Sequence, residues 1–181
     1  MRGGDPVGAR TRCYQLACHV SVATALISGL YAVPLVAQAP VHWTASSAGT
    51  VAQNATVAAH ISAAIDAGWH MYALTQGPGG PIATRITVAS GQPFTLQGEP
   101  TGPAPRREFD PNFGITVEEY EERAAFAVPV AVGAAPVGQD SIVVRARYQV
   151  CNASLCLPPR TENVAVPVTV AAAGKKSAPT S

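Results

Sequence analysis

Two cysteines and two prolines stand close together in the stretch Tyr148-Gln149-Val150-Cys151-Asn152-Ala153-Ser154-Leu155-Cys156-Leu157-Pro158-Pro159. The run from Ile142 to Val150 leads into it and alternates apolar with polar residues. This pattern predicts a β-strand that brings Cys151 to the end of a sheet. The two prolines have a fixed φ and no backbone donor, so the chain after Cys156 cannot continue as a central strand. We therefore expect both cysteines on a short, constrained loop between two strands.

The spacing of the cysteines bears on their purpose. In the chain-entropy model, a disulfide that closes a loop of about six residues stabilises a protein by about 2 kcal/mol, against about 4.7 kcal/mol for a loop of about a hundred. A small loop does keep two thiols close enough to close and reopen, which reversible exchange requires. The spacing favours a redox-active pair, with a minor structural disulfide in a secreted β-domain as the alternative.

Length and composition favour one β-rich domain. The chain has 181 residues, of which 48% are hydrophobic and 13% charged, with 16 glycines and 16 prolines. This mixture is typical of a domain with many turns, and part of the apolar content belongs to a targeting segment. The formal net charge of +1 gives no electrostatic support for binding nucleic acid or an anionic membrane.

The N-terminus has the pattern of a secretory signal. Arg2, Arg10 and Arg12 precede the uncharged apolar run Val20 to Val36, and Ala37-Gln38-Ala39 supplies a small-x-small cleavage pattern. We predict a signal peptide over residues 1–39 and no stable membrane insertion after its cleavage. A retained membrane anchor is the alternative, because Leu16 to Val36 is almost long enough to span a bilayer.

Cleavage would leave two of the four cysteines. Cys13 and Cys18 lie in the signal, so Cys151 and Cys156 alone remain. An exported protein with such a pair resides in an oxidising compartment, where a pair that is kept reduced needs a source of electrons.

Periodicity predicts seven to nine strands and no helix. Trp43 is expected to face the core, and Asp66-Ala67-Gly68 to form a hairpin turn. The expected strands are Val41–Ser47, Val51–Ile65, Trp69–Leu74, Ile82–Val88, Pro93–Gln97, Ala124–Val132, Ser141–Val150 and Asn163–Val170. The chain is thus predicted to form an antiparallel β-sandwich over residues 40–170, followed by a flexible tail, residues 171–181.

Two further segments are less regular. The stretch from Gly98 to Gly114 is predicted to be a long loop rich in Pro, Gly and Arg, and its Phe109 and Phe113 form either a satellite cluster or a lid. The acidic run Glu118 to Glu122 is expected to be a solvated strand edge or a short helical turn rather than a metal site.

Three groups of residues resemble the N-terminal domain of the bacterial thiol:disulfide interchange protein DsbD. They are Gly68 to Tyr72, Phe113-Gly114 with Tyr120 beyond it, and Tyr148 to Pro159. The Cys-x4-Cys-x-Pro-Pro element after Tyr-Gln is the most specific, and the resemblance extends over about residues 50 to 170. It implies a periplasmic immunoglobulin-like sandwich without a cofactor. Such a domain takes electrons from a membrane-embedded donor through a thioredoxin-like domain and passes them to thioredoxin-like proteins, either disulfide isomerases or cytochrome c maturation thioredoxins.

The resemblance also implies roles for individual residues. Cys156 would form the mixed disulfide with partners and Cys151 would resolve it. An aromatic cap loop would cover the pair. The residues matched to the cap loop are Phe113 and Phe109, and those matched to the lining of the site are Tyr72, Asp110 and Tyr148. His70 stands where an aromatic is common in the family, and the segment between the cysteines is one residue shorter than usual.

The physical chemistry of such a site agrees with these roles. Only a thiolate attacks a disulfide, and a hydrophobic cap both blocks access and disfavours the charged thiolate by desolvation. A nearby Asp110 would disfavour the thiolate further.

Two other functional classes remain open. A periplasmic copper-binding module could draw its soft or borderline ligands from Cys151, Cys156, Met71, His42, His60 and His70. A non-catalytic immunoglobulin-like binding module would hold an inert structural disulfide. No Ser/His/Asp constellation or nucleophile elbow indicates a hydrolase.

Overall fold

A computed structural model describes residues 39–174, which form twelve β-strands and no helix. The predicted signal peptide lies outside the described residues except for Ala39, and so does the predicted tail from residue 175 onward. Among the residues that are described, no helix is of a length and hydropathy that could span a membrane.

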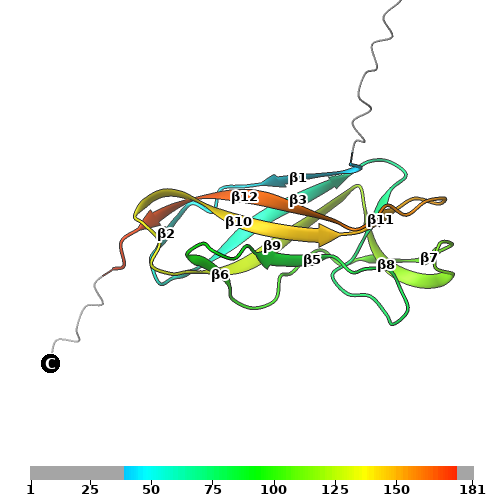
Figure 1. Ribbon diagram of the computed structural model, residues 1–181, viewed down its shortest axis with the longest axis horizontal. Coiled ribbons are helices and arrows are strands. Elements are labelled where there is room, and N and C mark those ends of the chain that lie inside the picture. Colours follow the sequence, from blue (N-terminus) through cyan, green and yellow to red (C-terminus); the bar gives the residue numbers. More distant parts are fainter. Residues whose placement is uncertain (1–38, 175–181) are drawn as a thin grey trace, which may run out of the picture. The chain divides into compact units, whose positions relative to one another are not determined.

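The strands form three four-stranded sheets. Figure 1 shows the strands, with a label on each except β4. The first sheet contains β1 (Val41–Ala45), β3 (Thr56–Ile65), β9 (Arg123–Val132) and β6 (Phe94–Leu96), in that order. The second contains β2 (Thr50–Ala52), β12 (Arg160–Ala171), β10 (Gly138–Tyr148) and β5 (Arg85–Val88). The third contains β11 (Val150–Cys151), β4 (His70–Tyr72), β8 (Ile115–Glu121) and β7 (Arg106–Asp110). All pairs are antiparallel except β2 with β12, and the architecture is an immunoglobulin-like β-sandwich, as predicted.

The core lies between the first two sheets because their strands place an apolar residue inward at every second position. On β9 the buried residues run from Ala124 to Val132, and on β12 from Val164 to Val170. Most are valines, which suit a pleated, buried surface. Trp43 packs against this core, with its ring 5.9 Å from Phe126 and 5.6 Å from Tyr148. The prediction that Trp43 faces the core is confirmed.

The predicted strand from Val51 to Ile65 is wrong as a single element. It divides into β2 and β3, which belong to different sheets. The chain turns between them at Asn54, which adopts a left-handed φ of 62°. Asparagine tolerates that conformation better than most residues, so the turn is compatible with the sequence although alternation conceals it.

The predicted hairpin at Asp66-Ala67-Gly68 is also wrong. A turn exists there, since the Trp69 amide donates to the Asp66 carbonyl at 3.1 Å and Gly68 has a φ of 81°. However, β4 does not return along β3. It pairs with β8 and β11 and so begins the third sheet.

The long loop from Gly98 to Gly114 contains a strand that the composition concealed. Its second half forms β7, which makes a hairpin with β8 in the register Arg106↔Glu119 to Asp110↔Ile115. The acidic run follows on β8, where Glu119 and Tyr120 are buried. The expectation of a fully solvated edge is therefore wrong for Glu119, because β7 and β4 flank β8 on both sides.

Candidate functional site

The cysteine pair lies at the edge of the third sheet. The chain breaks from β10 at Gln149 and forms β11, in which Cys151 pairs with His70 of β4. Cys151 is fully buried and Cys156 is partly exposed, and a disulfide of 2.00 Å joins their sulfurs. A thiolate arriving from solvent can therefore reach Cys156 far more readily than Cys151.

The loop between the cysteines is held by its own hydrogen bonds. The Asn152 side chain accepts from the amides of Ser154 and Leu155 at 2.9 and 2.8 Å. The Leu157 amide donates to the Val150 carbonyl at 2.9 Å and closes the loop beyond the second cysteine. These bonds hold Cys156 beside Cys151 independently of the disulfide, so closing of the disulfide orders little additional chain.

Tyr72 forms the floor under Cys156. Its buried hydroxyl lies 3.9 Å from the Cys156 sulfur and donates to Asp110 Oδ2 at 2.5 Å. Burial and the hydrogen bond with Asp110 both raise the pKa of Tyr72, so the phenol stays protonated. Because its one proton goes to Asp110, the hydroxyl can accept from a Cys156 thiol but cannot donate to a thiolate.

Asp110 is a buried carboxylate at the end of β7. Burial acts to raise its pKa, but the hydrogen bonds from the Tyr72 hydroxyl and from Asn112 outweigh burial and the pKa lies below its usual value. The backbone and side-chain nitrogens of Asn112 donate to Oδ1 at 2.7 and 3.1 Å. Asp110 therefore carries a negative charge close to the cysteine pair at neutral pH.

The turn of the β7–β8 hairpin lies against the cluster that contains Cys151. The amides of Phe113 and Gly114 donate to the Asp110 carbonyl at 3.3 and 2.8 Å, and Gly114 has a φ of 68°. The Phe113 ring meets Tyr72 edge-on at 5.9 Å and packs, with Cys156, on a small cluster of Tyr72, Val117 and Cys151. The Asn112 side chain donates to the Asn152 carbonyl at 3.0 Å and joins the hairpin turn to the cysteine loop.

The structure does not bring the other two predicted residues into this cluster. Phe109 is 66% exposed, on the opposite face of β7 from buried Asp110. Tyr148 packs in the main core and donates to Glu162 at 2.5 Å, and burial with that hydrogen bond raises its pKa. A role for either residue in the site stays a prediction.

The sequence analysis did not assign two neighbours of Tyr72, His70 and Glu119, to the redox site. His70 lies two residues before Tyr72 on β4, so both side chains share a face, and its Nε2 lies 3.4 Å from the Tyr72 hydroxyl. Glu119 joins them from β8, and burial raises its pKa. Alternation along β4 could have pointed to His70, but Glu119 stood in a run that resembled a solvated edge.

The candidate copper ligands do not gather at one place. Met71 is buried in the main core, the cysteines are bonded to each other, and His42 pairs with Asp66 at 3.1 Å. Across residues 39–174, no group of three or more His, Cys, Asp or Glu side chains is arranged to hold a metal ion.

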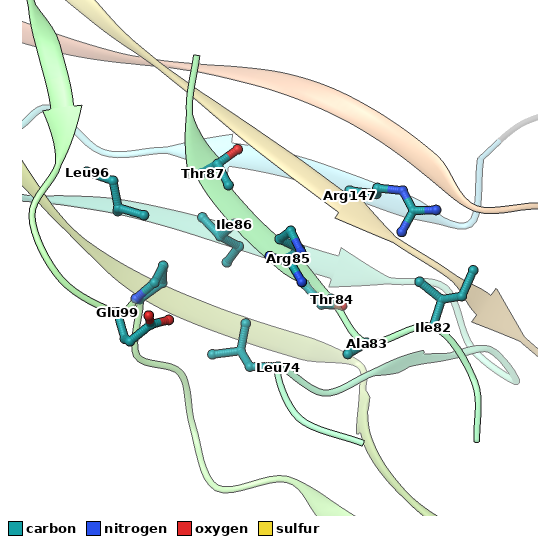
Figure 2. A pocket seen from close by; sticks show the side chains of 11 residues that line it. Leu74, Ile82, Ala83, Thr84, Arg85, Ile86, Thr87, Leu96, Glu99 and Arg147 are labelled. Atoms are coloured by element: carbon teal, nitrogen blue, oxygen red, sulfur yellow. The ribbon is translucent and has the colours of Figure 1, made fainter. Parts of the chain in front are cut away.

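A hollow of about 360 Å³ lies beside β5, and Figure 2 shows the side chains that line it. The lining combines apolar residues such as Leu74, Ile86 and Leu96 with Arg85, Arg147 and Glu99. Neither cysteine contributes to it, nor do Tyr72, Asp110 or Phe113. We place the candidate site at the cysteines because only thiol and disulfide groups can carry out exchange.

The family described as the N-terminal part of the thiol:disulfide interchange protein DsbD matches residues 37–168. No curated protein sequence matches the chain at a significant level.

Solved structures are also similar in part, and three of them are as follows. The reduced N-terminal domain of DsbD from Neisseria meningitidis is 19% identical, with a TM-score of 0.44 over 62% of this chain and 78% of that chain. The N-terminal periplasmic domain of ScsB from Proteus mirabilis is 18% identical, with a TM-score of 0.46 over 68% of this chain and 44% of that chain. BcpA, the major pilin subunit of Bacillus cereus, is 10% identical, with a TM-score of 0.38 over 72% and 39%. The match therefore covers less than half the length of the ScsB and BcpA chains.

Proposed function

Because this chain belongs to the family of N-terminal domains of the thiol:disulfide interchange protein DsbD, we propose that it is a periplasmic exchange domain that works through Cys151 and Cys156. It passes reducing equivalents from a membrane electron donor to thioredoxin-like proteins of the disulfide isomerase or cytochrome c maturation type. One observation carries the proposal: the cysteines form a small-loop disulfide between one buried and one partly exposed residue.

Reduction of the domain proceeds in two exchanges. A partner thiolate attacks the Cys156 sulfur, the bond to Cys151 breaks, and Cys151 leaves as a thiolate that takes up a proton. The partner's second thiolate then attacks its own sulfur in the mixed disulfide, and Cys156 leaves and takes up the second proton. Two electrons and two protons have passed from the partner dithiol to the domain, and the reverse sequence delivers them to an acceptor.

The surroundings of Cys156 favour a slow, protected thiol. The Asp110 charge and the acceptor oxygen of Tyr72 both favour the protonated sulfur. Phe113 packs over the pair and must move aside before a partner thiolate approaches. A reduced pair can therefore persist in an oxidising compartment until a docked partner displaces the cap.

The reduction potential of Cys151–Cys156 tests the proposal. The purified protein is equilibrated in graded thiol buffers, trapped by alkylation and counted by mass, and the same mass reports whether residues 1–39 have been removed. A value within roughly −180 to −270 mV, the span of known exchange proteins, supports electron transfer. A value well below about −300 mV would identify a structural disulfide and favour the binding-module alternative.

A further inference from the structure

His70 lies on β4, an inner strand of the third sheet, and is paired in register with Cys151. On β4 it lies between Cys151 of β11 and Glu121 of β8, its register partners on either side. Its side chain is 13% exposed, and its ring meets that of Tyr72 edge-on at 5.2 Å. The imidazole is therefore a largely buried, titratable group one side chain away from Cys156.

Two buried carboxylates share this imidazole. His70 Nε2 lies 3.5 Å from Asp110 Oδ2 and 3.6 Å from Glu119 Oε2, and those side chains are 0% and 5% exposed. Charges that are removed from water need a counter-ion. Within residues 39–174, His70 is the one cationic group at ion-pair distance from either carboxylate.

The other charged groups around His70 are already paired and more exposed. Glu121 of β8 and Arg106 and Glu108 of β7 line, with His70, a hollow of about 330 Å³. Arg106 forms ion pairs with both Glu108 and Glu121, and all three side chains are between 42% and 56% exposed. Solvent screens them, so they offset the buried carboxylates only weakly.

We propose that His70 is a positioning residue whose protonation sets the reactivity of Cys156. The protonated imidazole offsets the Asp110 charge behind Tyr72, and the Cys156 thiolate forms more readily. When His70 loses its proton, the carboxylate charge is no longer offset, and Cys156 is held as the less reactive thiol. This inference rests on the proposed function of the pair, and it makes exchange less steeply dependent on pH in the range where histidine titrates.

The distances set the size of the effect. Since His70 Nε2 is 3.4 Å from the Tyr72 hydroxyl and that hydroxyl is 3.9 Å from the Cys156 sulfur, the imidazole lies within about 7 Å of the sulfur. A unit charge at that distance in a partly buried site changes the pKa of a thiol by about one unit. The thiolate fraction, and with it the rate of reaction, changes about tenfold.

The test is the pH profile of alkylation of Cys156 by iodoacetamide in the reduced protein, followed by peptide mass spectrometry. In the wild-type protein we expect the logarithm of the rate to rise with pH, flatten over about one unit as His70 loses its proton, and rise again. His70→Gln should give a straight line that is about tenfold slower below the flat region and equal to wild type above it. Glu119→Gln is the matched control and should keep the flat region.

Three outcomes would overturn the inference: no flat region in wild type, a flat region that persists in H70Q, or one that E119Q abolishes. Should H70Q fail to fold, the wild-type protein decides, because the NMR titration midpoint of the His70 ring protons must coincide with the flat region. The profile is independent of the reduction potential. A potential below about −300 mV contradicts the redox role alone, whereas a straight wild-type profile with a potential in the exchange range contradicts the role of His70 alone.

Discussion

Replacement of Phe113 by alanine tests whether the hairpin turn caps the cysteine pair. Phe113 is the one side chain of that turn that packs on the cluster of Tyr72, Val117 and Cys151. The backbone of the turn is held separately, by the amides of Phe113 and Gly114 on the Asp110 carbonyl and by the hydrogen bonds of Asn112. The substitution should therefore free the cap without unfolding the hairpin.

The structure allows the size of the effect to be worked out. A fully buried phenylalanine costs about 3–5 kcal/mol when replaced by alanine, and an edge-on aromatic pair contributes about 0.5–1.5 kcal/mol of this. Phe113 is only partly buried and lies at a loop, so we expect the closed cap to lose about 1–2 kcal/mol. That loss corresponds to a population of open cap that is about 5- to 30-fold larger.

The assay is the rate at which the reduced pair reacts with a small disulfide or an alkylating agent, measured by stopped flow at one pH. Phe113→Ala should react about 5- to 30-fold faster than wild type. Phe109→Ala is the matched control and should stay within about twofold of wild type, because this ring is 66% exposed and lies outside the cluster. Urea unfolding of both variants separates cap opening from global unfolding. An unchanged rate in F113A, or an equal acceleration in F109A, would refute the cap assignment.

Three further predictions concern stability. Reduction of Cys151–Cys156 should lower the free energy of unfolding in urea by about 2 kcal/mol, and a loss above about 4 kcal/mol would contradict the small-loop account. Asp110→Asn should destabilise the domain by about 1–3 kcal/mol at pH 7. Because the folded pKa of Asp110 is lowered, its contribution exists above the unfolded pKa and is lost as pH falls, so D110N and wild type should converge in acid. Glu119→Gln should instead stabilise the domain at pH 7. The folded pKa of Glu119 is raised, so the contribution of this side chain to folding stability is present at low pH and is lost as pH rises through that pKa. An E119Q variant that is less stable than wild type at pH 7 would contradict this prediction.

Several parts of the fold could be predicted because they depend on single strands. Alternation shows which residues share a face, so the burial of Trp43 and the inward valines of β12 follow from local pattern. The cysteines were likewise found from their spacing and from the prolines that follow. The match to the DsbD family over residues 37–168 agrees with the resemblance carried by those residues.

The third sheet could not be predicted in the same way. Its strands β4, β7 and β11 are two to five residues long, too short for a clear period. β4 pairs with β8 and β11, which lie far along the chain from it, whereas β7 forms a hairpin with the strand that follows it, β8. The composition of β7 is typical of a loop. The alternating pattern from Val51 to Ile65 predicted one continuous strand and did not reveal the turn at Asn54. The partner of β4 could not be predicted for a different reason: a strand's own residues specify its faces but not which strand lies beside it.

The sequence by itself determined that this protein has an all-β domain in which Cys151 and Cys156 are closely spaced and followed by two prolines, since strand faces and cysteine spacing are local properties. Only the tertiary structure decided what surrounds that pair. Pairing of β4 with β8 and β11 brings His70, Tyr72, Asp110 and Glu119 into contact beside Cys156. Burial and hydrogen bonding then shift the pKa values of Tyr72, Asp110 and Glu119, because both effects depend on which groups lie next to one another and not on the order of residues in the chain.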